Sequence, residues 1–415
     1  MKIKTKNADF SYVEKIEKPK HKRPQKPWGI LGALINIIAL PDLIATKFKY
    51  KTERMDKAGK GPYLILMNHS SFIDLEIAYR IFWPRKFSIV CTSDGFIGKN
   101  FIMRKLGCIP TNKFVTDISL ISDMLHSIRK NKVSVLMYPE ASYSFDGTQT
   151  PLPKRLGVLI KKLDVPVVTV MTEGAFLRDP LYNGLQKRKT KVSATVKCLF
   201  TTEEVRSFDA DKLSEILEKE FTFDNFARQV ETNTHITEKF RADGLERILY
   251  KCADCKSETA MVGKGTALTC NKCGKTYEMD TLGRLKATDG ETKFSHIPDW
   301  YKWERECVKK EIENGEYKLD CEVEIGVMAD FKAIYMVGSG RLVHTKDGFT
   351  LTGCDGKLNY TQSANSSYGL YADYFWYEIG DVICIGDKKR LYYCFPKDKV
   401  NVAKARLAAE EIYKI

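Results

Sequence analysis

Between residues 61 and 200 the sequence alternates short apolar runs with longer amphipathic stretches, and no other feature constrains the fold as strongly. The runs have the length of buried strands, and the stretches repeat their apolar residues at a helical period. This alternation predicts a layered α/β domain. The predicted strands are Tyr63–Met67, Phe87–Cys91, Val133–Tyr138, Val165–Met171 and Val192–Phe200, and the helices include Phe72–Trp83, Ile118–Asn131 and Leu156–Leu163.

The C-terminal quarter has a different pattern. From Tyr317 to Phe395 about seven short alternating runs are separated by turn residues, which predicts an all-β unit, and Val400–Ile415 is an amphipathic helix. That order resembles pleckstrin-homology-like (PH-like) barrels capped by a C-terminal helix, which bind lipid headgroups or proteins. A plain β-sandwich fits the pattern equally well, because no specific motif distinguishes the two.

Two C-x-x-C pairs lie between these regions. Cys252 and Cys255 are followed by Cys270 and Cys273, with short hairpin-like runs between and after them. Four thiolates at this spacing suit tetrahedral zinc, and a shell of four protein ligands is structural rather than catalytic. The sequence therefore predicts a zinc ribbon with a spacer or docking role; unpaired reduced thiols are the alternative.

These patterns divide the chain into five segments. The expected order is a basic tail with a membrane-interface helix (1–60), an α/β domain (61–245), a zinc ribbon (246–282), a helical linker (283–314) and a PH-like β domain (315–415).

The chain is basic, and its charge is concentrated at one end. Its 67 Lys and Arg residues exceed its 53 Asp and Glu residues, giving a net charge of +14. Residues 1–60 contain 15 basic and 6 acidic residues, a surplus of 9. Such an excess favours partners that carry phosphate or other anionic groups. No aromatic residues are interleaved with basic ones at the cysteine pairs, so no nucleic-acid partner is expected.

An apolar stretch follows this basic lead. Residues 28–40 read WGILGALINIIAL, thirteen residues without a charge, and Pro41 comes next. A bilayer span needs about 20 apolar residues. A short apolar helix beside a basic cluster instead suits a segment lying on an anionic membrane surface. We therefore expect a peripheral or monotopic protein at the cytoplasmic face of a membrane; the alternative is a buried helix with a solvated tail.

The first motif with chemical meaning is N-H-S-S-F-I-D at residues 68–74, directly after a predicted strand. Ser71 is placed to cap the following helix, with Asp74 in its first turn. A carboxylate five residues after His69 can lie under the imidazole across such a turn. It would fix the tautomer and leave the other ring nitrogen free to accept a proton from a hydroxyl. A helix-capping segment with a surface histidine is the alternative.

Three further blocks follow in order. They read G-C-I-P-T-N-K at residues 107–113, Y-P-E-A-S-Y-S at 138–144, and V-P-V-V at 165–168. Together with N-H-x-x-x-x-D they resemble the glycerolipid acyltransferase family, which includes 1-acylglycerol-3-phosphate and glycerol-3-phosphate acyltransferases. The resemblance covers about residues 28–200.

This resemblance implies roles for individual residues. His69 would be the general base and Asp74 its orienting partner. Glu140, with Ala141 and Ser142, would help to place the acceptor. Gly107, Ile109 and Lys113 belong to the second block, where Lys113 would lie near a substrate phosphate and backbone amides would stabilise the oxyanion. The acyl thioester of coenzyme A or acyl carrier protein would be the co-substrate, and the chemistry requires no catalytic metal.

The sequence also departs from the family pattern. The arginine of the second block is Lys113, which cannot form a bidentate fork. The glycine and threonine of the third block are Ala141 and Ser142, and its arginine is Tyr143, so a phosphate-binding guanidinium is missing. Lys154 or Arg155 could substitute for it. Tyr143 itself could serve as a packing aromatic.

These residues predict an enzyme of phospholipid biosynthesis. It would transfer an acyl group to the hydroxyl of a membrane-borne lysophospholipid, with 1-acylglycerol-3-phosphate as the first candidate and phosphatidic acid as the product. Another lysolipid is an alternative acceptor because Tyr143 replaces the arginine. A non-catalytic lipid- or nucleic-acid-binding adaptor is the alternative from a different class. Intact His69, Asp74 and Glu140 favour the enzyme.

Overall fold

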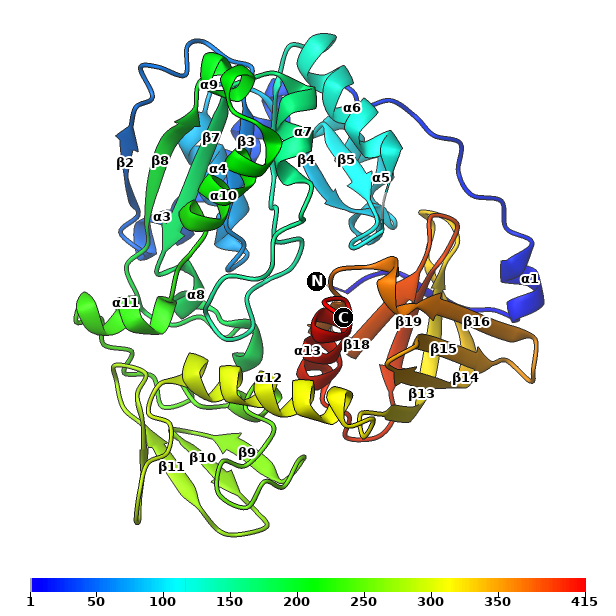
Figure 1. The fold of residues 1–415 in the computed structure, drawn as a ribbon. Helices are drawn as coiled ribbons and strands as arrows, with labels where there is room; N and C mark the ends of the chain where they lie inside the picture. The colour runs from blue at the N-terminus through cyan, green and yellow to red at the C-terminus, as the bar shows by residue number, and fades with distance from the viewer. Residues whose placement is uncertain (1, 116) are drawn as a thin grey trace.

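A computed structural model describes residues 2–115 and 117–415. Within them, one mixed sheet forms the centre of an α/β unit (residues 28–231), with strand order β2-β8-β7-β3-β6-β4-β5 (Figure 1). Its strands are β2 (Lys49–Glu53), β3 (Leu64–Met67), β4 (Phe87–Thr92), β5 (Cys108–Thr111), β6 (Ser134–Met137), β7 (Val167–Glu173) and β8 (Ser193–Phe200). Two of them, β2 and β5, are not among the predicted strands, because β2 is an exposed edge of charged residues and β5 is short and contains a proline.

The centre of this sheet is parallel. Strand β3 pairs in parallel with both β6 and β7, and β4 pairs in parallel with β6 and β5. The carboxyl ends of β3, β4, β5 and β6 therefore meet at one edge, where α/β proteins commonly place their sites. The loops that leave this edge carry His69, Asp94, Lys113 and Glu140.

Helices cover both faces of the sheet, because alternate residues of each strand point to opposite sides. Ile65 and Met67 of β3 join one core with α4, whereas Leu64 and Leu66 join another with α6, α7 and α10. The helices of the unit are α2 (Gly29–Ile38), α3 (Leu40–Ala45), α4 (Ile73–Phe82), α5 (Asn100–Lys105), α6 (Ile118–Arg129), α7 (Leu156–Leu163), α8 (Ala175–Arg178), α9 (Thr202–Ser207), α10 (Ala210–Glu220) and α11 (Asn225–Glu231).

The first residues do not form a free basic tail, in contrast to the sequence expectation. β1 (Thr5–Asn7) pairs in parallel with β14 of the C-terminal sheet, and α1 (Phe10–Glu14) buries Phe10 and Val13 beside it. The chain then returns to the α/β unit, where Arg23 lies 3.0 Å from Asp123. This long-range pairing joins the two ends of the chain, and a single local stretch of sequence carries no signal of it.

The cysteine pairs lie in a small antiparallel sheet, here called the ribbon unit (residues 246–287). Its strands are β9 (Met261–Lys264), β10 (Ala267–Cys270), β11 (Thr276–Met279) and β12 (Leu285–Ala287), and helix α12 (Ile297–Glu313) follows. Trp300 of α12 is fully buried, its indole N–H donates to the carbonyl of Lys251, and its ring packs 4.9 Å from Tyr277. The predicted linker is therefore a core helix in the structure.

The C-terminal β unit (residues 317–415) is an antiparallel sheet in the order β16-β15-β14-β13-β19-β18-β17. Its elements are β13 (Leu319–Met328), β14 (Ile334–Thr345), β15 (Gly348–Gly353), β16 (Leu358–Ser363), β17 (Tyr371–Trp376), β18 (Gly380–Gly386), β19 (Leu391–Pro396) and α13 (Val402–Ile412). The predicted all-β region with a closing helix is present, and its likeness to PH-like barrels stays a prediction.

Helix α13 lies in the middle of the molecule (Figure 1). It packs against α12 and β17, and Arg305 of α12 pairs with Glu410 and Glu411 of α13 at 2.7 and 2.8 Å. Arg406 of the same helix contacts the α/β unit at Tyr143. The β unit is thereby held beside the carboxyl edge of the parallel strands.

Candidate active site

His69 and Asp74 lie on the turn between β3 and α4. Nδ1 of His69 is 3.2 Å from Oδ2 of Asp74, and the same oxygen accepts hydrogen bonds from the backbone N–H groups of Ser70 and Ser71 at 2.7 and 3.0 Å. The turn therefore aims three donors at one carboxylate oxygen. A carboxylate beside Nδ1 favours the tautomer with the proton on that nitrogen.

Two tyrosines fix the plane of the imidazole. The rings of Tyr138 and Tyr143 stack on its opposite faces, with centroids 4.1 and 4.0 Å away. The His69 side chain is 18% exposed. Burial lowers its pKa below the ordinary 6.5, and Asp74 opposes that effect. A ring held in this way, with Nδ1 toward Asp74, has Nε2 available for another proton.

Tyr143 is thus a packing aromatic in the structure, one of the two alternatives from the sequence. Its ring stacks on His69 and also meets Phe72 edge-on at 5.7 Å. The phenol ring of Tyr143 carries no positive charge. The site therefore needs a different source for any second cation.

Glu140 holds the backbone of the site rather than an open position for a ligand. One of its carboxylate oxygens accepts from the backbone N–H of His69 and the other from that of Thr150, both at 2.9 Å. Burial raises the pKa of Glu140 to about 7 against these two hydrogen bonds. Through these two hydrogen bonds the carboxyl group holds the His69 turn against the loop after β6.

The two residues after Glu140 explain part of the motif. Ala141 has a φ of +58°, in the left-handed region that favours glycine, which accounts for the glycine of the related motif. Ser142 is buried, and its hydroxyl oxygen has no hydrogen-bond partner within the described residues. The loop is therefore strained at one residue and carries an unpaired polar group at the next.

The second block is divided between core and site. Gly107 has a φ of +78°, and a Cβ there would lie 2.5 Å from Pro27, so it serves a close approach of the backbone. Ile109 is fully buried among the helices and strands of one core. Lys113 lies beyond the end of β5, where its ammonium is 4.2 Å over the ring of Tyr371 and its charge contributes to the lowered pKa of His69.

Lys154 and Arg155 do not replace the missing arginine in this arrangement. Both are exposed at the start of α7, and the ammonium of Lys154 lies 5.0 Å over the ring of Tyr413. The guanidinium that reaches Tyr143 is that of Arg406, whose Nη1 donates to the Tyr143 carbonyl at 3.3 Å. Sequence reasoning missed Arg406 because 263 residues separate the two.

Two more acidic residues near Lys113 were also missed. Asp94 is buried after the end of β4 and accepts hydrogen bonds from the hydroxyls of Tyr371 and Tyr393 at 2.7 and 3.2 Å. Asp373 lies on β17, and its charge acts on Lys113. The position of Asp94 at the carboxyl end of a parallel strand was a usable signal, but no local pattern marks Asp373.

The four predicted metal ligands lie together. The Sγ atoms of Cys252, Cys255, Cys270 and Cys273 all lie within 4.8 Å of one another, and two of the pairs are 3.8 and 3.7 Å apart. Four sulfurs at about 2.3 Å from one zinc ion would be about 3.8 Å apart, so the donor set fits tetrahedral zinc.

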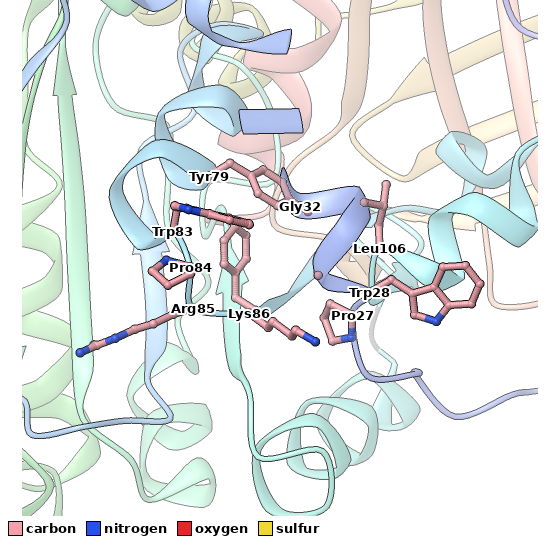
Figure 2. Close-up of a pocket in the computed structure, with 11 residues that line it drawn as sticks. Pro27, Trp28, Gly32, Tyr79, Trp83, Pro84, Arg85, Lys86 and Leu106 are labelled. Atoms are coloured by element: carbon pink, nitrogen blue, oxygen red, sulfur yellow. The ribbon is translucent and has the colours of Figure 1, made fainter. Parts of the chain in front are cut away.

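A second feature of the α/β unit is an exposed apolar surface on α2 and α3, here called the apolar face. Ile30 is 81% exposed and Ile44 is 71% exposed. Its other exposed members are Leu34, Ile37 and Ile38. Beside α2 is a pocket of about 90 Å³ whose lining includes Trp28, Trp83 and the cation Lys86 (Figure 2). Among the described residues no helix is both long and apolar enough to span a bilayer.

Part of the chain is similar to known proteins. Residues 47–173, which include His69, Asp74, Lys113 and Glu140, match the family model named Acyltransferase. The 1-acyl-sn-glycerol-3-phosphate acyltransferase of Saccharomyces cerevisiae is 25% identical over 175 residues, which cover 40% of this chain and 54% of the yeast protein. The chain thus spans about half the length of this relative.

A solved structure is also similar. The 1-acyl-sn-glycerophosphate (LPA) acyltransferase PlsC from Thermotoga maritima has a TM-score of 0.37 at 17% identity, over 49% of this chain and 80% of that chain. Neither the ribbon unit nor the C-terminal β unit falls within the matched family segment.

Proposed function

We propose that the protein transfers an acyl group from a thioester to the hydroxyl of a lysophospholipid, and the match of residues 47–173 to the acyltransferase family model supports this. The first candidate acceptor is 1-acylglycerol-3-phosphate, which is named in the yeast relative, and the product would be phosphatidic acid. The donor is an acyl-CoA or the acyl thioester of acyl carrier protein. The observation that carries the proposal is the His69–Asp74 pair, whose geometry leaves Nε2 for a substrate.

In this reaction Nε2 of His69 accepts the proton of the lipid hydroxyl while Asp74 stabilises the resulting imidazolium. The hydroxyl oxygen attacks the thioester carbonyl, and a C–O bond forms. When the tetrahedral intermediate collapses, the C–S bond breaks and the sulfur leaves with the electron pair. The imidazolium returns its proton to that sulfur, so the products are an ester and a free thiol.

Glu140 and the two tyrosines act by positioning. Glu140 holds the backbone N–H of His69, and the stacked rings of Tyr138 and Tyr143 exclude water from both faces of the imidazole. A dry, fixed imidazole needs no rearrangement as charge develops, which is where most of the catalytic benefit of such a site arises.

The test measures the free thiol released from acyl-CoA, or from acylated acyl carrier protein, in the presence of a panel of lysolipid acceptors. We expect acceptor-dependent release that His69→Ala lowers by about 10²-fold or more. His126→Ala, at a histidine on α6 outside the site, is the matched control. Equal release by wild type and His69→Ala with every donor and acceptor would support the adaptor alternative instead.

We also propose that the apolar face binds to an anionic membrane surface, at the cytoplasmic side. Support comes from exposed isoleucines that a solvated helix would not retain, and from the basic segment that precedes α2. The pocket with Lys86 and two tryptophans beside α2 has the mixture of cation and aromatic rings that suits a headgroup region (Figure 2).

Flotation of the full chain with vesicles of mixed neutral and anionic phospholipid tests this binding. Ile30→Glu with Ile44→Glu should abolish flotation. Val158→Glu, at an exposed valine of α7 on the other side of the sheet, should leave it unchanged. If both variants float as wild type does, the apolar face is not the membrane contact.

The four cysteines are proposed to hold one structural zinc ion. Their donor chemistry and mutual distances support this, and the ion would stabilise the ribbon unit on which α12 packs. No step of the transfer reaction involves it.

A further inference from the structure

The turn that carries the general base is held from outside at both of its ends. At the start, the side-chain oxygen of Asn68 accepts the backbone N–H of Thr172 on β7 at 2.7 Å. At the other end, the buried hydroxyl of Ser71 donates to the carboxylate of Asp179. Neither the proton transfer nor the pairing of the imidazole with Asp74 accounts for this second carboxylate.

Asp179 directly follows α8, on the segment that leaves β7. Because β7 pairs in parallel with β3, this segment starts from the same sheet edge as the His69 turn. Asp179 and Ser71 are both buried, although 108 residues separate them. Their contact therefore depends on the fold of the sheet and not on the sequence of the turn alone.

A buried arginine fixes the position of this carboxylate. Nη1 of Arg178 lies 2.8 Å from Oδ2 of Asp179, while Oδ1 of the same carboxylate accepts the hydroxyl of Ser71. Nη2 of Arg178 lies 2.5 Å from Asp42 of α3, which also pairs with Lys187 at 2.9 Å. Desolvation offsets much of the attraction in a buried ion pair, so such a pair adds little net stability. What it supplies here is a fixed position for the Asp179 carboxylate.

Ser71 connects this carboxylate to the base. Its backbone N–H donates at 3.0 Å to Oδ2 of Asp74, the oxygen that lies 3.2 Å from Nδ1 of His69. Its hydroxyl oxygen also accepts the N–H of Ile73 at 3.3 Å, in the first turn of α4. A displacement of Ser71 would therefore displace the imidazole and its carboxylate together with the start of the helix.

We propose that Asp179 is a positioning residue for the general base His69. Arg178 holds its carboxylate, and the carboxylate fixes Ser71, so that the turn keeps the imidazole where proton transfer requires it. The proposal rests on the acyl transfer proposed above and adds to it two residues outside the matched segment 47–173. Asp179 acts through the turn and not on the acceptor, so its loss should affect kcat and not KM.

Steady-state kinetics of acyl transfer test this role. Asp179→Ala should lower kcat by about tenfold, because a misplaced catalytic group reacts more slowly, and should leave KM for the acceptor within about twofold. Ser71→Ala, which removes the other partner of the bond, should give a similar loss. The double variant should lose no more than either single variant, whereas independent effects would multiply to about a hundredfold. Asp123→Ala, at another buried aspartate that pairs with Arg23 at 3.0 Å, is the matched control and should change neither constant.

Hydrogen exchange of the full chain, followed by mass spectrometry, separates this role from the reaction, because it requires no turnover. Asp179→Ala should speed amide exchange in the peptide that covers residues 68–74 by about tenfold, since a hydrogen bond to a charged group is lost. Exchange in the peptides of α6 should stay unchanged. This local result would support the positioning contact even if no acyl transfer is found, whereas faster exchange throughout the α/β unit would mean that Asp179 has only a structural role.

If Asp179→Ala does not fold, the isosteric Asp179→Asn decides the question. A neutral amide oxygen accepts a weaker hydrogen bond than a carboxylate, so the same changes are expected at about threefold. Unchanged kcat and unchanged exchange in the folded Asp179 variant would overturn the proposal. A multiplied loss in the double variant with Ser71→Ala, or an equal loss of kcat in Asp123→Ala, would overturn it as well.

Discussion

The His69 turn and the boundary between the two units each contain a carboxylate, buried Asp74 and partly buried Asp373, but their surroundings are assembled in opposite ways. Asp74 receives the imidazole and two backbone N–H groups from residues within five positions of it. Asp373 receives its cations from residues 113 and 406, far away in the chain. The base and its orientation are thus encoded locally, whereas the headgroup environment depends on how the units pack.

The difference also has an electrostatic side. The two N–H groups and the imidazole at Asp74 come from the turn that leads into α4, so these contacts involve no residue of the β unit. The pKa of Asp373 is raised to about 6, because burial outweighs the charges of Lys113 and Arg406.

The largest expected effect separates these two carboxylates directly. Asp74→Asn should lower kcat by about 10²- to 10⁴-fold, because the imidazole loses the charge that stabilises its protonated form. Asp373→Asn, which makes the same chemical change at the boundary, should leave kcat within about twofold. Steady-state kinetics with saturating acceptor measure both. Equal losses of kcat in the two variants would mean that the comparison is wrong.

The cysteine cluster, like the His69 turn, is built from residues that are close in sequence. Cys252→Ser should lower the zinc content from about one equivalent to less than about half and should destabilise the ribbon unit with α12, since metal binding contributes to folding. Metal analysis and thermal unfolding measure these effects. Cys307→Ser, at a cysteine of α12 outside the cluster, is the control and should keep the metal. Wild-type protein with less than about half an equivalent would contradict the zinc assignment.

These contrasts explain what could be read from the sequence. The N-H-x-x-x-x-D turn, the strand before it and the cysteine pairs depend on short-range geometry, and the structure brings their residues together as the spacing predicts. The pairing of β1 with β14 and the position of Arg406 depend on packing between distant segments. The motif predicts Glu140 as a site residue. The motif does not predict that its carboxylate joins the His69 turn to Thr150, because that depends on the hydrogen bond from the backbone N–H of Thr150.

The kinetic constants should depend on pH in two ways: an acid limb from His69 and an alkaline limb from Lys113. Burial lowers the pKa of His69 below 6.5, and a base works only when unprotonated, so the limb of kcat/KM that reports His69 should lie below pH 6.5. Burial also lowers the pKa of Lys113 below 10.5, and a lysine loses its charge above its pKa. As pH is raised, KM for a phosphate-bearing acceptor should therefore begin to increase at an alkaline pH lower than 10.5.

Lys113→Arg sharpens this test, because arginine keeps its charge throughout that range. The variant should lose the alkaline limb and keep the acid limb. An acid limb with its midpoint above pH 6.5 that persists in Glu140→Gln would contradict the buried environment assigned to His69. An alkaline limb that persists in Lys113→Arg would show that another group causes it.

The smallest effect concerns the strained residue between the two regions. Ala141→Gly should relieve the cost of a left-handed alanine, about 1 kcal/mol, and part of that gain is lost to the greater freedom of glycine in the unfolded chain. We expect a net gain in unfolding free energy below about 1 kcal/mol and unchanged transfer activity. Chemical denaturation measures the first quantity. A loss of stability would show that the strain at Ala141 is already compensated.

The central claim is that His69 deprotonates a lipid hydroxyl so that this oxygen takes the acyl group from a thioester. The most direct measurement follows a labelled acyl chain from acyl-CoA into extracted lipid, with lysophosphatidic acid as the acceptor and with wild type and His69→Ala side by side. We predict labelled phosphatidic acid with wild type and about 10²-fold less or lower with His69→Ala. Labelled phosphatidic acid formed equally by both proteins would contradict the account.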